Sequence, residues 1–441
     1  MISISKDSFI QTIEQYLLQY RSLFKKRSFD IFFWLMLAII SVEEVRSIRF
    51  LHENFIKKYS KKALNSLYYV LSYIHFPTEE LLKITVGIAV SLIPDTLKNS
   101  TIFLTIDDTL QVKFGDHFDC YFQHFDHANK TGSSYLQGHC FVSLIINIPL
   151  SYQGKTRILS LPVGYRLYTK DKSKLQIASE MIDSAMEYLK DFQVILLCDS
   201  WYSKGIIIET VKNYNNLDLI AAVRSDTALF DLPPAPTGKR GRPRVHGDKL
   251  DKTTFSFEKL GDYYVSKKQA MTRLFDQPVY VTVTTTNPEE LTSVRVYIST
   301  LNPEEVQLFK DHEQEESNSS FKGSENLTLR AYGIRWNIEV IFYQQKFFWG
   351  FSNYMVRNKL AIERYVNLLA IGFTLVSVLP FLDQRLKAWQ FESPQIIKRE
   401  IASQIHKELI LSSFVSSLEN SKIYSSIKES VRCYLEGRKI A

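Results

Sequence analysis

The sequence has few cysteines, and they are not spaced as a metal site or a disulfide framework requires. The chain of 441 residues contains only four, Cys120, Cys140, Cys198 and Cys433, and no CxxC pair. The pattern therefore does not indicate a disulfide-stabilised scaffold. Cys198 lies inside an apolar run, where we expect a reduced core residue.

The sequence also lacks an uninterrupted apolar run that resembles a membrane span. Ile31–Ile40 is too short to cross a bilayer. Val366–Leu382 is longer but contains Asn367 and Pro380, so we expect a buried helix there. The first 21 residues are amphipathic and charged, unlike a signal peptide. We therefore expect a soluble intracellular protein that does not enter a membrane.

No strong excess of one charge is present. Lysine and arginine number 54 against 47 acidic residues, for a net charge of +7. This mildly basic balance is compatible with nucleic acid binding and does not demonstrate it. Phenylalanine and tyrosine are abundant, at 29 and 24, which argues against disorder. The length allows two to four domains.

Residues 1–98 show helical spacing of apolar residues throughout, and two basic clusters interrupt them. The clusters lie at 25–27 and within 57–62. A helical DNA-binding module would use such clusters on phosphates. Solvated helix ends are the alternative explanation for the same charges.

Two short apolar runs each end in an acid. TIFLTID, 101–107, ends at Asp107 and is followed by Asp108, and QVILLCD, 193–199, ends at Asp199. Both runs are typical of buried strands. Because side chains alternate along a strand, only one of Asp107 and Asp108 should face a site. Further strands at 138–150, 156–169 and 217–223 alternate with helices at 173–190 and 203–215, which predicts a mixed sheet covered on both faces.

Two polar segments separate these elements. Residues 116–140 are rich in histidine but match no zinc pattern, and we expect a loop that lies near DNA. Residues 225–326 combine a basic, Pro- and Gly-containing linker with short β-like runs. Within the linker, Arg240 and Arg242 flank a glycine in a pattern similar to a minor-groove hook. A flexible loop with solvated charges is the alternative.

The segment LTLRAYGIRWNIEVIFYQQKFFWGF, 327–351, has a helical period. At about 100° per residue, one narrow face carries Tyr332, Arg335, Glu339 and Lys346. The opposite face is apolar and should pack on a core, with Ile334, Ile338, Ile341 and Phe348. By itself this pattern also fits a solvated surface helix. Helical patterns follow, both after Gly350 and over 383–441.

The three acids Asp107, Asp199 and Glu339 would suit hard divalent cations. Mg²⁺ binds through a few carboxylates, waters and substrate phosphates. Two such ions about 4 Å apart can activate a hydroxyl and stabilise the leaving oxygen of a phosphodiester. Cationic neighbours such as Arg335 and Lys346 would hold phosphates.

In combination these motifs resemble those of a known family. Tyr332-x2-Arg335-x3-Glu339-x6-Lys346 is similar to the Tyr-Arg-Glu-Lys helix of cut-and-paste DDE transposases in the insertion sequence family numbered four. IDDT, 106–109, resembles the first-acid strand of that family, with its Asp-x-Thr register on Asp107. LLCDSWYSKG, 196–205, resembles its second-acid strand. A β-rich insertion before the Glu is also a family feature, so the resemblance covers about residues 100–375.

The resemblance implies an α/β fold with an RNase H-like catalytic core, in which helices flank a mixed sheet. We expect the core in two parts, at 99–224 and 327–382. The β-rich insertion with its basic linker would occupy 225–326. Helical regions would occupy 1–98, as a DNA-binding domain, and 383–441.

The resemblance also implies roles for single residues. Asp107, Asp199 and Glu339 would be catalytic and bind two Mg²⁺ or Mn²⁺ ions, while Tyr332, Arg335 and Lys346 would grip the transposon end. Characterised members release the element through a DNA hairpin, and a flipped base needs an aromatic platform. Candidates for that platform are Trp201, Tyr202 and Trp336.

The expected partners are double-stranded DNA, as terminal inverted repeats and target, and a second copy of the chain in a homodimer. The expected location is the cytoplasm, with the nucleoid when DNA is bound. The leading alternative is a catalytically inactive, transposase-derived protein that binds ends without cutting them. A nuclease of the same fold without a joining step is a further alternative.

Overall fold

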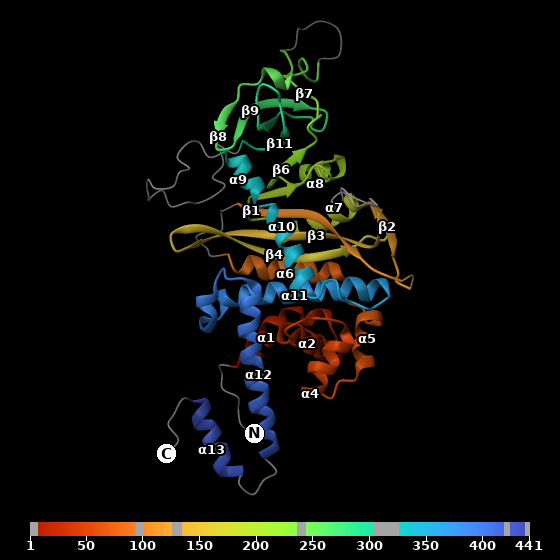
Figure 1. The fold of residues 1–441 in the computed structure, drawn as a ribbon, viewed down its shortest axis with the longest axis vertical. Coiled ribbons are helices and arrows are strands. Elements are labelled where there is room, and N and C mark those ends of the chain that lie inside the picture. Colours follow the sequence, from red (N-terminus) through yellow and green to blue (C-terminus); the bar gives the residue numbers. More distant parts are fainter. Residues whose placement is uncertain are drawn as a thin grey trace.

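The computed structural model describes residues 8–93, 101–115, 117–125, 135–235, 244–302, 326–418 and 424–436. The molecule is elongated, with helices of the N-terminal region at one end, a sheet in the middle and the strands of the 225–326 segment at the other end (Figure 1). The last two helices, α12 (Pro394–Leu418) and α13 (Tyr424–Leu435), extend beyond the helical end, whereas α11 (Lys359–Leu382) lies between the sheet and the N-terminal helices (Figure 1).

The sheet is mixed, as expected for an RNase H-like fold. Its order is β2-β3-β1-β5-β6-β11-β10-β9-β7, with β4 paired to β3 and β8 to β9. β1 pairs with β3 in antiparallel and with β5 in parallel, and β5 and β6 are parallel. The strands of the first half are β1 Ile102–Val112, β2 Phe122–Phe125, β3 Tyr135–Tyr152, β4 Lys155–Leu167, β5 Val194–Cys198 and β6 Leu217–Val223.

The β-rich insertion continues this same sheet. Its strand β11 pairs in antiparallel with β6, so the ladder passes from the core into the insertion without a break. The remaining insertion strands follow outward from β11. The bounds are β7 Leu229–Phe230, β8 Glu258–Leu260, β9 Tyr263–Thr272, β10 Val279–Thr285 and β11 Arg295–Ser299, with a short 3₁₀ turn, η4, at Lys252–Thr254.

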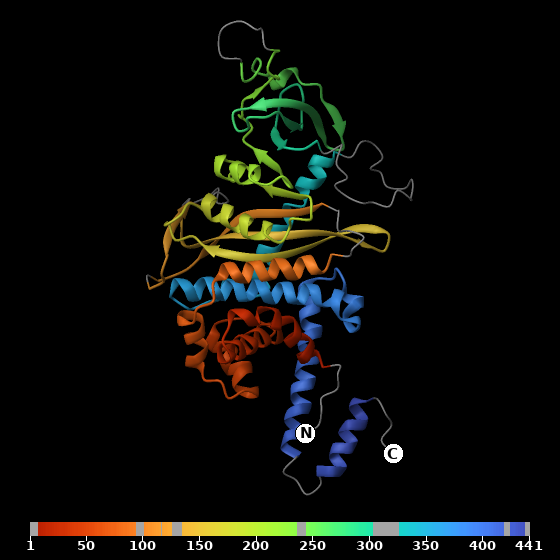
Figure 2. The ribbon, with the colours of Figure 1, turned by 180° about the vertical axis from the view of Figure 1, so that it is seen from behind.

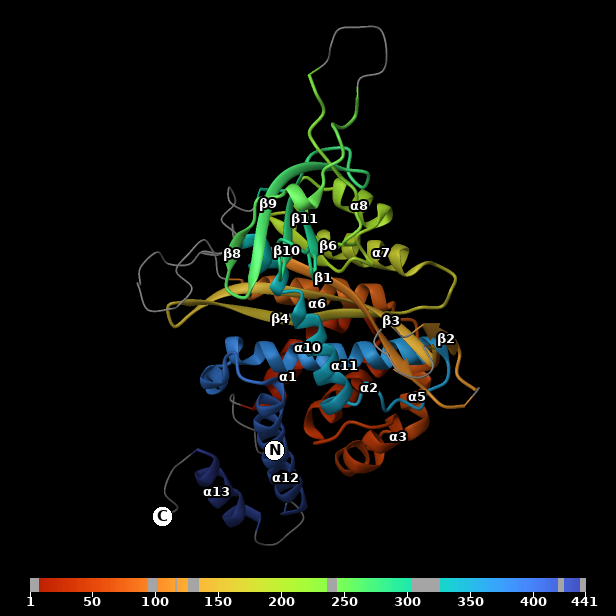
Figure 3. The same cartoon turned by 45° about the horizontal axis from the view of Figure 1, so that its top comes forward.

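Helices cover both faces of the core strands. α7 (Lys174–Met186) and α8 (Gly205–Lys212) lie on one face (Figure 2). α9 (Leu327–Gly333) lies on the other face (Figure 1), and α10 (Trp336–Phe348) crosses that face (Figure 3). α7 begins at a capping box, in which the Ser173 hydroxyl accepts from the Gln176 N–H and the Gln176 side chain accepts from the Ser173 N–H.

The N-terminal region is helical, as expected. Its elements are α1 Phe9–Leu17, η1 Leu18–Leu23, α2 Lys26–Ser41, α3 Ile48–Leu51, η2 His52–Ile56, α4 Lys57–Tyr59, α5 Leu64–Tyr73 and α6 Thr78–Ser91. The C-terminal elements are α11 Lys359–Leu382, η5 Gln384–Trp389, α12 Pro394–Leu418 and α13 Tyr424–Leu435.

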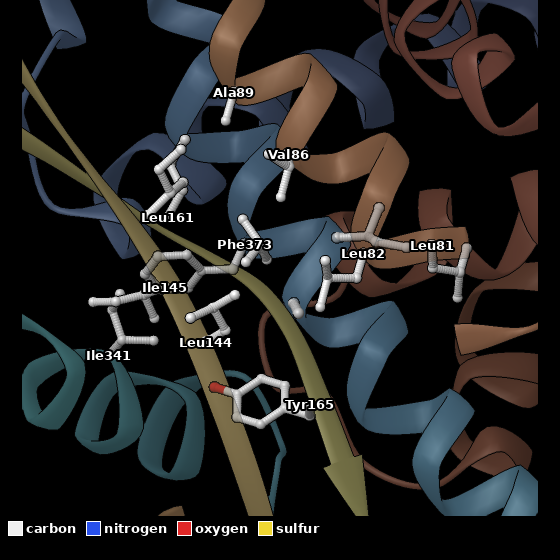
Figure 4. Close-up of a cluster of buried hydrophobic side chains, with 14 of the residues drawn as sticks. Leu81, Leu82, Val86, Ala89, Leu144, Ile145, Leu161, Tyr165, Ile341 and Phe373 are labelled. Carbon is white, nitrogen blue, oxygen red and sulfur yellow. The ribbon is translucent and has the colours of Figure 1, made fainter. Parts of the chain in front are cut away.

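A continuous hydrophobic core joins the helical region to the sheet. Leu82 and Val86 of α6, Leu161 of β4, Phe373 of α11 and Ile341 of α10 all belong to it (Figure 4). α11 is long and apolar enough to cross a membrane, but 89% of its apolar window is buried inside the fold. It is thus the buried helix expected at Val366–Leu382.

The expected single helix over 327–351 is interrupted. The N–H groups of Ile334, Arg335, Asn337 and Ile338 each bond to the carbonyl three residues earlier, so the chain tightens between α9 and α10. Three-residue hydrogen bonds give more rotation per residue than an α-helix does, so the side chains that follow lie on other faces of the helix than predicted. Ile338 and Ile341 are buried as expected, but Phe348 is 46% exposed, so its prediction was wrong.

The chain turns sharply after Phe348. Trp349 is fully buried in its place, and Gly350 follows with φ 72°. A Cβ at Gly350 would lie 2.1 Å from the Val45 carbonyl oxygen, so only glycine fits this approach. The helix expected directly after Gly350 was also wrong, because α11 begins only at Lys359, where the Asn358 side chain caps it. Within the expected loop at 116–140, Phe122–Phe125 forms strand β2.

Candidate active site

Asp107 on β1 lies near Asp199, the first residue after the neighbouring strand β5. In the parallel ladder, Thr105 of β1 is opposite Leu197 of β5. Two residues further along each chain, the same register reaches Asp107 and Asp199. Side chains two residues apart share one face, and Leu197 packs in the hydrophobic cluster beneath α9. Both carboxylates therefore face α9 and α10.

Glu339 joins them through Arg335. The Arg335 guanidinium lies 2.8 Å from Oδ2 of Asp107 and 3.7 Å from Oε1 of Glu339. The side chains of Arg335 and Asp107 are only 14% and 12% exposed, whereas Glu339 is 40% exposed. Two acids, from β1 and α10, thus lie at one guanidinium, and the charge of Asp199 in the loop after β5 also acts on it.

The Asp107 carboxyl group responds to this crowding. Burial, followed by the charge of Asp199, raises its pKa to about 8. Arg335 acts in the opposite direction, and the charge of Glu339 raises the pKa further. The acids are therefore close enough to repel one another, and the site favours additional positive charge.

The loop after β5 holds the Asp199 carboxylate in place. The backbone N–H groups of Trp201 and Tyr202 donate to Oδ1 of Asp199 at 2.9 and 3.1 Å. Two bonds to one oxygen leave the other oxygen for a different partner. The arrangement is an Asx-type turn that holds Oδ1 of the acid against its own loop.

Asp108 lies on the other face of β1. Its carboxylate accepts hydrogen bonds from Lys174 Nζ of α7 at 2.8 Å, from Tyr202 Oη at 2.9 Å and from Cys140 Sγ at 3.2 Å. It points toward α7, away from α10. Of the two adjacent acids, only Asp107 therefore shares a face with Glu339.

The donor set at this site suits a divalent cation, but not in the arrangement seen. Among the residues described, no three His, Cys, Asp or Glu side chains are placed to enclose a metal ion. Arg335 occupies the space between Asp107 and Glu339 and supplies the positive charge there. Mg²⁺ and Mn²⁺ prefer carboxylate oxygens as ligands, so the types of these residues, though not their arrangement here, suit such ions.

A cavity of about 620 Å³ opens beside the acids. Its wall combines core residues, including Asp199, Tyr332 and Trp336, with residues of the insertion strands. From the insertion come Tyr263, Arg295 and Tyr297, which sequence reasoning missed. Tyr297 packs edge-on against Tyr332, with ring centroids 4.8 Å apart. Only the pairing of β11 with β6 brings these residues to the site.

The predicted DNA-binding residues in and between α9 and α10 differ in exposure and in the groups that they contact. Trp336 is 63% exposed at the rim of the cavity. Tyr332 is half-buried, and burial raises its pKa to about 12. Arg335 contacts the acids. Lys346 Nζ donates to the Leu110 carbonyl of β1 at 2.9 Å, so it contacts the sheet.

The other residues predicted to bind DNA are Trp201, Arg240 and Arg242. Trp201 lies beside the Asp199 loop, with Lys174 Nζ 4.7 Å and Lys204 Nζ 4.3 Å from its ring centroid. Arg240 and Arg242, proposed as a minor-groove hook, lie outside the described residues.

Comparison with known proteins agrees with this geometry. Residues 80–274 match the family model described as DDE superfamily endonuclease. The match includes Asp107 and Asp199 and ends before Glu339, so it spans a little under half of the chain. No curated protein matches the sequence. Over the part that carries its two strand acids, the chain is thus similar to DDE superfamily endonucleases, which supports a nuclease or transposase of the DDE type.

Proposed function

We propose that this protein is a DDE transposase that cuts DNA at the ends of a mobile element and joins them to target DNA. The observation that carries the proposal is the proximity of Asp199 and Glu339, from two distant segments, to Asp107 of an RNase H-like sheet, where the charges of both raise the pKa of the Asp107 carboxyl and Arg335 links Asp107 to Glu339. Such a cluster of acids has no evident structural purpose there. A site for divalent cations and phosphates explains it.

In this proposal Asp107, Asp199 and Glu339 would hold Mg²⁺ or Mn²⁺, two ions in the active complex. Such ions activate the attacking water or 3′-hydroxyl and stabilise the leaving oxygen. The protein supplies the fixed carboxylates. The Trp201 and Tyr202 amides orient Asp199, and the buried β1 strand fixes Asp107.

Arg335 would have two alternative partners. Without DNA, its guanidinium neutralises Asp107 and approaches Glu339. When a DNA end enters, a phosphate offers the bidentate acceptor that a guanidinium prefers. Transfer of Arg335 from carboxylate to phosphate would free the acids for metal at the time when substrate arrives.

The cavity beside the acids supports the hairpin step implied by the resemblance. A nucleotide turned out of the duplex needs aromatic surfaces and cationic groups. Tyr263, Tyr297, Tyr332 and Trp336 line this cavity, together with Arg224 and Arg295. The basic clusters of the N-terminal helices would bind flanking phosphates, since Lys25, Lys26 and Arg27 are all exposed at the start of α2. We further propose a homodimer on two ends, in the cytoplasm and at the nucleoid.

Labelled element ends incubated with the protein and Mg²⁺ test the proposal. We expect strand cleavage at the end and transfer of the cut 3′ end into plasmid DNA. Binding without cleavage would instead identify an inactive transposase-derived binding protein. Cleavage without transfer would identify a nuclease, which the DDE superfamily endonuclease match also accommodates.

A further inference from the structure

Asp108 has no role in the proposed chemistry, yet it is surrounded by donors. Lys174 Nζ and Cys140 Sγ donate to its Oδ2, and Tyr202 Oη donates to its Oδ1. Its two oxygens are thereby engaged on the face of β1 opposite the acids. A carboxylate that is only 15% exposed and has three donors is held in one position.

Tyr202 connects Asp108 to Asp199. Its hydroxyl donates to Asp108, and its backbone N–H donates to Oδ1 of Asp199. Tyr202 is 1% exposed, so its ring is packed and cannot easily rotate. Tyr202 thus connects Asp108, on one face of β1, to Asp199, which lies on the side of the opposite face.

The neighbouring Trp201 is held by the same group of residues. Its N–H is the second donor to Asp199, and its ring lies 4.7 Å from the Lys174 ammonium that pairs with Asp108. Within the loop itself, the Ser203 N–H also bonds to the Asp199 carbonyl at 3.2 Å. The orientation of Asp199 therefore depends on amides whose positions are set from the Asp108 side.

We infer that Asp108, through Tyr202, is a positioning residue that fixes the Asp199 carboxylate for metal binding at a set distance from Asp107. Asp107 and Asp108 are adjacent on β1, so the hydrogen bonds of Tyr202 fix Asp199 relative to the strand that carries Asp107. The inference rests on the proposed function, because it assigns Asp199 to a metal. Partners that orient a ligand commonly change metal affinity when they are removed.

Tyr202→Phe tests this with the smallest change, since it removes only the hydroxyl. Tyr214→Phe is a matched control, because the Tyr214 hydroxyl donates to Asp183 at 2.8 Å in a Tyr–Asp bond formed elsewhere in the chain. The readouts are Mn²⁺ bound to the protein alone, measured by electron paramagnetic resonance, and the Mn²⁺ concentration that half-saturates cleavage. Loss of bound Mn²⁺ in Asp199→Ala defines the signal of the site.

For Tyr202→Phe we expect about 10-fold weaker Mn²⁺ binding and about 10-fold higher half-saturating Mn²⁺, with end binding and the melting temperature near those of the wild type. Asp108→Asn should weaken Mn²⁺ binding in the same direction. Tyr214→Phe should change neither readout. Wild-type Mn²⁺ affinity in Tyr202→Phe, or an equal loss in Tyr214→Phe, would overturn the inference.

Two outcomes separate this inference from the proposed function. If Asp107→Ala, Asp199→Ala and Glu339→Ala lose cleavage while Tyr202→Phe binds Mn²⁺ normally, only the positioning role of Asp108 fails. If those three variants cleave like the wild type, the proposed function fails. Unfolding of both Tyr202→Phe and Asp108→Asn would also overturn the inference, since these hydrogen bonds would then serve folding.

Discussion

From the position of Arg335 we predict an effect on the free energy of unfolding that can be measured without DNA. Its guanidinium is the cation that the structure places between Asp107 and Glu339. Arg335→Gln keeps much of the side-chain length and removes the charge. Because the pKa of Asp107 is about 8, the ionised acids are then left to repel one another without compensation above this pH, where the loss of stability should be measured.

The magnitude follows from burial. Removing one partner of a buried ion pair costs about 3–5 kcal/mol. Arg335 and Asp107 are 14% and 12% exposed, but Glu339 is 40% exposed and solvent screens it, so we expect about 3 kcal/mol, at the lower end of that range. Divalent metal should restore most of this, because a ligand at 100 times its Kd stabilises the native state by about 2.7 kcal/mol.

The assay is thermal unfolding in EDTA and in Mn²⁺. Arg335→Gln should melt below the wild type in EDTA and should gain more from Mn²⁺, since no guanidinium competes with the ion. Arg224→Gln is the control, because the Arg224–Asp226 pair borders the same cavity but is 76% and 66% exposed. Its melting temperature should change little in either buffer. Equal Mn²⁺ gains in Arg335→Gln and the wild type would refute the competition between guanidinium and metal.

Three other predictions concern single side chains. Lys346→Ala should weaken end binding and reduce the slope of log affinity against log salt by about 1, and an unchanged slope would exclude a phosphate contact. Trp336→Ala should leave the melting temperature unchanged, since the side chain is 63% exposed, but should slow cleavage in a gel assay; an unaltered rate would exclude a role for its ring. Burial lowers the pKa of Lys398 from 10.5 to about 8. The unfolded chain then binds more protons between these values, so wild-type stability should gain from this group as pH rises from 8 to 10.5. Lys398→Met should lack that gain and be more stable at pH 7 in a pH series of melts.

Local patterns were sufficient to predict the strands that carry the acids. An apolar run that ends in an acid predicts a buried strand with a carboxylate at its end. Asp199 follows β5 directly, as predicted, whereas β1 continues past Asp107 to Val112, so the strand end predicted at Asp107 was wrong. Alternation along the strand predicted that only one of Asp107 and Asp108 would face α10. The mixed α/β sheet followed from the alternation of strands and helices.

Long-range pairing was beyond the reach of these patterns. Nothing in the β-like run around Tyr297 indicates that β11 joins the edge of β6, so the insertion's part of the cavity was missed. The side-chain donors to the Asp108 carboxylate lie 32, 66 and 94 positions further along the chain. A uniform helical period also fails at Ile334 and Arg335, where three-residue hydrogen bonds tighten the chain and alter which side chains are buried.

The central claim is that Asp107, Asp199 and Glu339 form one metal-dependent cleavage site. The most direct test measures cleavage of labelled element ends in Mg²⁺ by the wild type and by Asp107→Ala, Asp199→Ala and Glu339→Ala, with end binding measured in parallel. Asp108→Asn serves as the comparison at the adjacent acid. We predict that each of the three alanine variants binds ends normally and cuts none, while Asp108→Asn cuts less than the wild type and regains cutting when Mg²⁺ is raised. Wild-type cutting by any one of the three would remove that residue from the site and contradict the account.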